Sequence, residues 1–238
     1  MKLHTLLDLR GNIPTFIHIS DGKLYEVNLL DQIAFEAGSF YVMDRGLLDF
    51  GRRHALHRAQ AFFVIRAKSN LQYQRRYSPP IDKASGLRCD QTVVLTGVQS
   101  CTDFPPPIRR IKFYDAAHDK LLGFLTNHFD RPALTITKLY RCRWQVELFF
   151  TWIKHHLRIN AFVGTSENAV KTQVWIAIAV YVLVAVVKNR LNRDASLYTI
   201  LQILSVTLFE KTPLDQLLAR IDREDESVQN GNQLILFI

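Results

Sequence analysis

The amino-acid sequence predicts an α/β fold in which a mixed sheet with flanking helices is interrupted by a β-rich insertion. Two short apolar runs, at 39–43 and 61–65, enclose a segment with helical character, and this order indicates a strand-helix-strand unit with parallel strands. Residues 70–129 hold clustered prolines and short β-like runs, whereas the chain from about residue 135 onward is mostly helical. Together these patterns indicate one large domain with an insertion.

The chain has the composition of a globular protein with an excess of positive charge. Of its 238 residues, 48% are hydrophobic and 22% are charged, which allows a sizeable core. Lysine and arginine number 30 against 22 aspartate and glutamate, so the formal net charge is +8. This excess favours a polyanionic partner. Nucleic acid and an anionic membrane surface both fit it, and many basic proteins bind neither.

The cysteines and the amino-terminal residues indicate a cytoplasmic protein. The three cysteines are odd in number and have no CxxC spacing, so they suggest neither a disulfide framework nor a zinc site. Residues 1–8 lack the apolar run and the small-residue cleavage site of a signal peptide. We therefore expect the chain to work in a reducing cytoplasm.

The first segment is expected to form a hairpin followed by a short helix. Leu3–Leu9 and Ile13–Ile19 are apolar-rich runs, and the turn-forming residues Arg10–Asn12 separate them. Residues 27–35 can form a short helix.

The strand expected at 39–43 leads to a carboxylate. Its sequence, SFYVM, is continuously apolar, which is typical of a strand buried on both faces in the interior of a sheet. It stops at Asp44, and a helix over 47–58 connects it to the second strand at 61–65. Asp44 is thus expected at the carboxyl end of an interior strand, where open α/β sheets bind ligands. The alternative for Asp44 is a solvated turn residue.

The segment 70–129 has a different character from the residues before it. Prolines cluster at 79–80 and 105–107, and residues 115–119 fit a hairpin loop. The β-like runs cover 92–95, 108–114 and 121–125. We interpret the segment as an insertion because the α/β pattern resumes after it.

The remainder of the chain is predicted to be helical. We expect one helix over 135–156, an apolar helix near 172–191 and shorter helices up to about Arg220. Val174–Val187 contains 14 residues without a charge, which is shorter than the run of about 20 that a membrane span needs. We expect this helix to be buried on several sides and packed against a sheet, with a membrane anchor as the alternative.

The helix at 135–156 places four polar groups on one face. At about 100° per residue, Tyr140, Arg143, Glu147 and Lys154 fall within a strip of roughly 60°. The neighbouring positions are heavily apolar, so a simple solvated face explains this strip poorly. It remains the alternative, because Arg143 and Glu147 also form an ordinary i,i+4 pair.

These four residues reproduce the pattern Tyr-x2-Arg-x3-Glu-x6-Lys, which resembles the signature of a subgroup of bacterial insertion-sequence DDE transposases. The similarity continues through residues 140–150, and the block at 41–46 resembles the segment that holds the second aspartate of this family. The runs 63–68 and 164–173 also look familial, and the similarity extends to about Leu218.

The resemblance implies a ribonuclease H-like fold and a two-metal reaction on DNA. Asp44 and Glu147 would be catalytic residues and two of three carboxylate ligands for Mg²⁺ or Mn²⁺, which prefer hard oxygen donors. Tyr140, Arg143 and Lys154 would bind the phosphates of double-stranded DNA at the transposon ends. The resemblance also implies target DNA as a partner, a homodimer in the DNA complex, no membrane, and association with the bacterial nucleoid in the cytoplasm.

The resemblance also sets the expected organisation of the chain. Residues 1–69 would form the first part of the ribonuclease H-like core and 70–129 the β-rich insertion. Residues 130–220 would complete the core with its carboxyl-terminal helices, and 221–238 would be a flexible tail.

The first aspartate of the family has no counterpart in this sequence. The family places it on a strand before the hairpin, and neither Asp8 nor Asp21 matches that position. We therefore expect an amino-terminally truncated transposase that is inactive by itself. The alternative is a DNA-binding relic without catalysis.

Two further groups of residues are candidate sites. The pairs His54/His57 and His155/His156 lack acidic or cysteine neighbours, so we interpret them as surface or DNA-facing residues. A basic set near Asp44 could follow a phosphate backbone or form a solvated face. The basic set comprises Arg52, Arg53, Arg58, Arg66 and Lys68.

Overall fold

The computed structural model describes residues 2–157, 164, 166–191 and 196–207. The chain divides into two compact units. The first unit comprises Met1–His4 and Phe16–Glu147, and the second comprises Thr5–Thr15 and Leu148–Ile238. The expected tail at 221–238, the helices expected beyond residue 207 and Thr165 of the block 164–173 lie outside the described residues.

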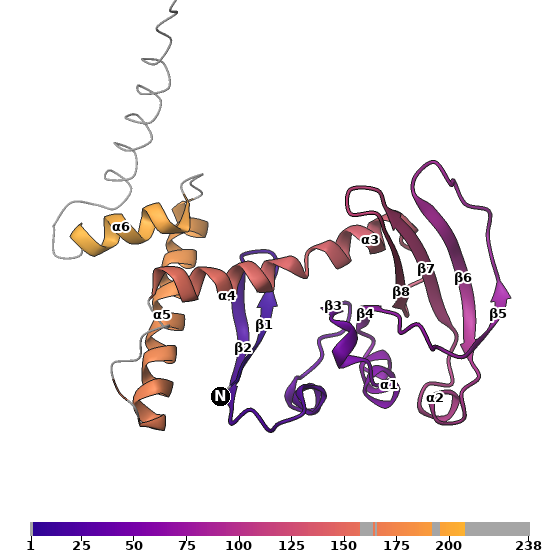
Figure 1. Cartoon of the computed structure of the whole chain (residues 1–238), viewed down its shortest axis with the longest axis horizontal. Coiled ribbons are helices and arrows are strands. Elements are labelled where there is room, and N and C mark those ends of the chain that lie inside the picture. The colour runs from indigo at the N-terminus through magenta and orange to yellow at the C-terminus, as the bar shows by residue number, and fades with distance from the viewer. Residues whose placement is uncertain (1, 158–163, 165, 192–195, 208–238) are drawn as a thin grey trace, which may run out of the picture. The chain divides into compact units, whose positions relative to one another are not determined.

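A mixed sheet of six strands forms the centre of the first unit (Figure 1). Its strand order is β3-β4-β8-β7-β6-β5, with β3 parallel to β4 and the other neighbours antiparallel. The strands are β3 (Phe40–Met43), β4 (Phe62–Arg66), β5 (Tyr73–Tyr77), β6 (Leu87–Leu95), β7 (Ile108–Asp115) and β8 (Lys120–Thr126). The predicted mixed α/β fold with flanking helices is confirmed.

The segment expected as a β-rich insertion extends this central sheet. β8 pairs with β4 through Val64↔Thr126 and Ile65↔Leu125, so the four strands β5–β8 are continuous with the parallel pair. The hairpin expected around 115–119 is confirmed, because β7 and β8 pair up to Asp115↔Lys120.

The predicted strand-helix-strand unit is confirmed as β3, α1 (Phe50–Arg58) and β4. The helix begins three residues later than expected, because the side chain of Asp49 accepts a hydrogen bond from the Arg52 backbone N–H (2.9 Å) and caps it. A 3₁₀ turn, η2 (Arg45–Leu47), precedes it. A second 3₁₀ helix, η1 (Glu26–Gln32), replaces the helix expected at 27–35.

The prediction that the strand before Asp44 is an interior strand is wrong for the described residues. β3 lies at one end of the strand order and pairs with β4 on one side. Its side chains alternate between buried, at Tyr41 and Met43, and half-buried, at Phe40 and Val42. A continuous apolar run does not distinguish this arrangement from burial on both faces.

Helices cover both faces of the sheet. On one face, α3 (Ala133–Arg141) packs through Ile136 and Tyr140 into a core with Val64, Ile111 and Phe124. Because side chains alternate along a strand, Phe63 and Ile65 project to the opposite face. There α1 packs against β4, and α2 (Val98–Asp103) packs against α1 and β6.

Two buried polar residues fix the edges of this layer. Asn127, just after β8, accepts a hydrogen bond from the Phe63 N–H (2.9 Å) and donates one to the Ala61 carbonyl (2.9 Å), which joins it to the start of β4. Arg109 on β7 pairs with both carboxylate oxygens of Asp90 (2.8 and 2.7 Å). Its remaining terminal nitrogen, Nη1, donates to backbone carbonyls of the loop 128–131 that leads into α3, including that of Arg131 at 2.6 Å.

The single helix expected over 135–156 is two helices. α3 ends at Arg141 and α4 (Trp144–His156) begins after a turn at 142–143. In this turn Arg143 N–H bonds to Tyr140 O and Val146 N–H to Arg143 O, both between residues three apart, so the α-helical ladder is interrupted. Neither glycine nor proline marks the break.

The second unit contains the tip of the hairpin of β1 (Lys2–Asp8) and β2 (Ile13–Ser20), together with α5 (Glu167–Leu191) and α6 (Leu197–Thr207). Tyr181 on α5 donates to the carbonyl of Asn12 at the hairpin tip (2.8 Å). Its ring contacts those of Phe149 and Trp152 on α4, with centroids 4.7 and 5.2 Å away.

Helix α5 is not buried on several sides, as the sequence led us to expect. Its buried residues follow helical spacing along one stripe, and Val184 packs against Ile200 and Ile203 of α6. Trp175 and Leu183 lie on its exposed side. By length and composition alone, Glu167–Arg190 could cross a membrane, a property that it shares with core helices of globular proteins.

The structure predicts a large loss of stability for Asp90→Ala. The substitution should lower the free energy of unfolding by about 3–5 kcal/mol, because it leaves the buried Arg109 guanidinium without its counter-charge. The matched control is Asp8→Ala, which removes the carboxylate paired with the exposed Arg10 and should cost less than about 1 kcal/mol. Urea unfolding followed by circular dichroism measures both values. Equal losses for the two variants would contradict the anchoring role of Arg109.

Candidate active site

Asp44 lies in a turn that a buried arginine holds in place. It follows β3 directly, is exposed, and its carbonyl accepts the Leu47 N–H (3.0 Å). The fully buried Arg53 donates to the sulfur of Met43 and to the carbonyl of Leu47, both at 2.7 Å, on either side of Asp44. Burial lowers the pKa of Arg53 to about 10, so it remains charged at neutral pH. Arg53 thus stabilises the turn that presents the carboxylate.

Tyr140 connects the core to Asp44. Its ring is buried on the last turn of α3 and lies 4.9 Å from the Phe124 ring, centroid to centroid. Its hydroxyl donates to Oδ1 of Asp44 over 3.4 Å, a long hydrogen bond. Burial raises the pKa of Tyr140, and the charge of Asp44 raises it further. The hydroxyl therefore keeps its proton at neutral pH.

Arg143 and Glu147 lie next to this pair. Arg143 is in the turn between α3 and α4, and its Nη1 donates to Oε1 of Glu147 on the first turn of α4 (3.0 Å). Burial opposes the charge on Arg143, but the hydrogen bond to Glu147 and the nearby negative groups outweigh it, so its pKa is raised. Asp44 is among those groups, which places the four residues in one electrostatic cluster.

The cluster is more solvated than the sequence suggested. Side chains at the start of α4 are exposed, including Trp144 at 60% and Leu148 at 46%. The side chain of Glu147 is 47% exposed. The apolar residues of this helix therefore do not enclose the polar ones, and an ion or phosphate could reach both carboxylates.

Arg66 is the residue of the basic set that contributes to the cluster. It ends β4, the strand beside β3, on the same face as Val64, and its charge lowers the pKa of the Tyr140 hydroxyl against the larger effects of burial and Asp44. The sequence placed Arg66 in the basic set but did not distinguish it from the other four cations.

The rest of the basic set does not form one surface near Asp44. Arg52 is engaged by the carboxylates of Asp31 and Asp49. Arg53 is buried, as described above. Arg58 lines a hollow with Gly38, at the amino ends of β3 and β4. Lys68 is exposed two residues beyond β4.

Lys154 and the histidines lie elsewhere. Lys154 is exposed on the last turn of α4 and belongs to the second unit. The rings of His54 and His57 both contact Phe104, at 5.7 Å between centroids. The ring of His156 stacks on Tyr198 at 4.3 Å.

The donor set at the cluster fits a divalent cation in kind but not in number. Asp44 and Glu147 offer the carboxylate oxygens that Mg²⁺ prefers, and both are accessible. Within the ranges that the structure describes, no group of three or more His, Cys, Asp or Glu side chains is arranged to hold a metal ion. The cluster therefore provides two of the carboxylates that a three-carboxylate site needs.

Comparison with known proteins identifies a family over most of the chain. The family model described as a transposase DDE domain matches residues 1–183. A protein of Sinorhizobium fredii named as a transposase, y4zB, is 36% identical over 196 residues, which cover 81% of this chain and 54% of the relative. A protein of Geobacillus stearothermophilus, named as a probable transposase for insertion sequence element IS5377, is 29% identical over 77% of this chain and 48% of its own length.

A Synechocystis protein named as a transposase for the element IS4SA is 23% identical, over 77% of this chain and 52% of its own length. The chain thus spans about half the length of the curated relatives that it matches. The family match covers most of the chain, and the mixed sheet with its flanking helices is consistent with the ribonuclease H-like fold of these enzymes. The chain therefore belongs to the DDE transposase family of insertion sequences.

Proposed function

We propose that this chain contributes two carboxylates and a phosphate-binding group to an active site that cleaves and joins DNA at insertion-sequence ends. The observation that supports this most strongly is the cluster of Asp44, Tyr140, Arg143 and Glu147, because the last turn of α3 brings residues distant in sequence to the end of β3. Membership of the DDE family makes DNA the expected substrate.

In this proposal, Asp44 and Glu147 bind divalent cations, Mg²⁺ or Mn²⁺. When bound, two such ions would stabilise the attacking and the leaving oxygen of a phosphodiester. The two carboxylates come from different elements, the end of β3 and the start of α4, so their separation depends on how α3 is seated. Residues that seat α3 are therefore positioning residues for the site.

The other members of the cluster can bind phosphate. Arg143 keeps its charge, and its planar guanidinium can donate two parallel hydrogen bonds to phosphate oxygens. Tyr140 remains protonated and can donate its hydroxyl proton to an oxygen of the DNA backbone. Arg66 adds positive charge from β4. We also assign Lys154 to phosphate binding, as a point charge on the last turn of α4.

We further propose that residues 1–238 bind DNA without cleaving it. The support is the number of ligands in the cluster, because it holds two carboxylates and the family uses three. Removing one carboxylate from such a site weakens the binding of the ions that activate the nucleophile and neutralise the leaving group.

Arg143→Ala should weaken binding to transposon-end DNA by about ten- to a hundredfold, because a charge-assisted hydrogen bond to phosphate contributes roughly 1.5–3 kcal/mol. The slope of log affinity against log salt should fall by about one phosphate contact. The control is Lys171→Ala, which removes the cation of another i,i+4 ion pair, on α5. Fluorescence anisotropy gives the affinities, and thermal melting shows whether either variant unfolds. Equal weakening in both would contradict the assignment of Arg143.

Cleavage should depend on both carboxylates and on a third. Nicking assays with Mg²⁺ and matched end DNA should detect no product with residues 1–238, and should detect it with a longer chain that supplies a further carboxylate. In that longer chain, Asp44→Asn or Glu147→Gln should abolish nicking and leave DNA binding largely intact. Asp82→Asn, in a loop outside the cluster, is the control. Nicking by residues 1–238 that survives Glu147→Gln would overturn the proposed site.

A further inference from the structure

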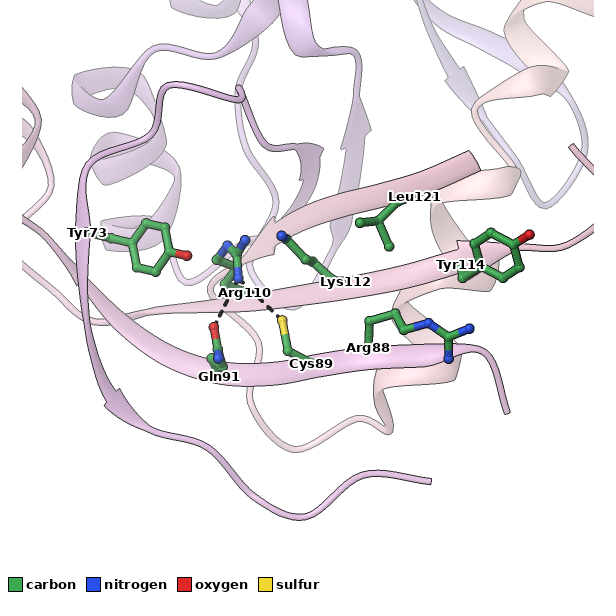
Figure 2. Close-up of a pocket in the computed structure, with 8 residues that line it drawn as sticks. All are labelled: Tyr73, Arg88, Cys89, Gln91, Arg110, Lys112, Tyr114 and Leu121. Carbon is green, nitrogen blue, oxygen red and sulfur yellow. Dashed lines mark hydrogen bonds between the residues drawn. The ribbon is translucent and has the colours of Figure 1, made fainter. Parts of the chain in front are cut away.

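A hollow of about 540 Å³ lies over β6 and β7, on the face of the sheet that α3 does not cover. Figure 2 shows its side chains projecting from neighbouring strands, with Arg110 between Tyr73 and Lys112. The residues that line it are Tyr73, Arg88, Cys89, Gln91, Arg110, Lys112, Tyr114 and Leu121.

The alternation of side chains along β7 separates this hollow from the Asp44 cluster. Ile111 belongs to the core under α3, so Arg110 and Lys112 on either side of it project to the opposite face. Across the strand pair, Gln91 lies opposite Arg110 and Cys89 lies opposite Lys112. The hollow is thus on the sheet face that α3 does not cover.

The hollow carries positive charge that no described carboxylate neutralises. Arg88, Arg110 and Lys112 take part in none of the ion pairs among the residues that the structure describes. A carboxylate at the rim, Asp119, accepts the hydroxyl proton of Tyr114 at 2.7 Å, and this hydrogen bond raises the pKa of the tyrosine. Arg109, next to Arg110 in sequence, is by contrast fully paired with Asp90.

Neutral groups hold the two arginines in place. Arg110 donates to Oε1 of Gln91 (3.0 Å) and to the sulfur of Cys89 (3.3 Å), and its guanidinium lies 4.7 Å from the Tyr73 ring centroid. Arg88 lies 5.1 Å from the Tyr114 ring centroid. These contacts fix the guanidinium groups without cancelling their charge, so less side-chain entropy is lost when an anion binds.

We propose that this hollow is a second DNA contact, which binds the phosphodiester backbone on the sheet face opposite the Asp44 cluster. Arg110 and Lys112 are two residues apart on one strand, about 7 Å, so they can neutralise separate phosphates. The tyrosines at its two ends can contact the sugars of the same backbone. The inference rests on the proposed function, because both sites take DNA, and the test below separates them.

The three native cysteines allow each site to be examined separately. Cys89 lies in the hollow, Cys142 lies in the turn between Tyr140 and Arg143, and Cys101 is exposed on α2. Pairwise combinations of C89S, C101S and C142S leave one thiol each. The rate of maleimide alkylation is then measured with and without a random-sequence DNA duplex, the matching single strand, or inorganic phosphate.

Duplex DNA at low salt should slow alkylation of Cys89 several-fold, and high salt should restore the rate. Arg110→Gln with Lys112→Gln should remove the protection of Cys89 and leave that of Cys142, while Cys101 should react at one rate throughout. The double variant should also lower the salt slope of binding by about two. Lys23→Gln with Lys171→Gln removes the same charge outside both sites and should leave the slope unchanged.

Each other outcome counts against the inference in a distinguishable way. Protection of Cys142 alone would show that DNA binds at the Asp44 cluster only, which overturns the second contact and preserves the proposed function. Protection of neither thiol would overturn both. Protection of Cys89 by inorganic phosphate as strongly as by DNA would make the hollow a simple anion site, and protection by the single strand alone would exclude a duplex.

Discussion

The seating of helix α3 depends on the buried ion pair between Arg109 and Asp90. Nε and Nη2 of Arg109 donate to the carboxylate of Asp90. Its third nitrogen, Nη1, donates to backbone carbonyls of the loop 128–131. A buried arginine without a counter-charge would be strongly destabilising, so the pair and the loop are fixed together. Because α3 begins directly after this loop, the pair also determines where Tyr140 meets Asp44.

The local elements of the fold could be predicted from the sequence, and their long-range pairing could not. Apolar runs and turn-forming clusters identified β3, β4 and the hairpin of β7 and β8. The pairing of β8 with β4 joins residues about sixty positions apart, and no local pattern encodes it. The break at 142–143 also escaped prediction, because hydrogen bonds between residues three apart, and no glycine or proline, produce it.

The same holds for the candidate site: the sequence identified several of its residues, but not the contacts that decide what each one does. Spacing alone left a solvated face open for Tyr140, Arg143 and Glu147, and their resemblance to the transposase signature selected them. The turn after α3, and not one continuous helix, brings them together. The basic set was not resolved by sequence, because a cation's role depends on what lies opposite it. Arg53 supports the Asp44 turn, and the charge of Arg66 lowers the pKa of Tyr140 against larger opposing effects, whereas composition presents the two arginines as equivalent.

The ion pair of Arg143 and Glu147 connects the two ligands of the proposed site. Each side chain is the ion-pair partner of the other, at 3.0 Å. A cation that binds Glu147 competes with Arg143 for the carboxylate, and a phosphate that binds Arg143 competes with Glu147 for the guanidinium. Either ligand therefore removes a contact that opposes the other, and by linkage each raises the affinity for the other by the same factor. In the proposed site, this arrangement would favour the loading of metal and DNA together over the loading of either alone.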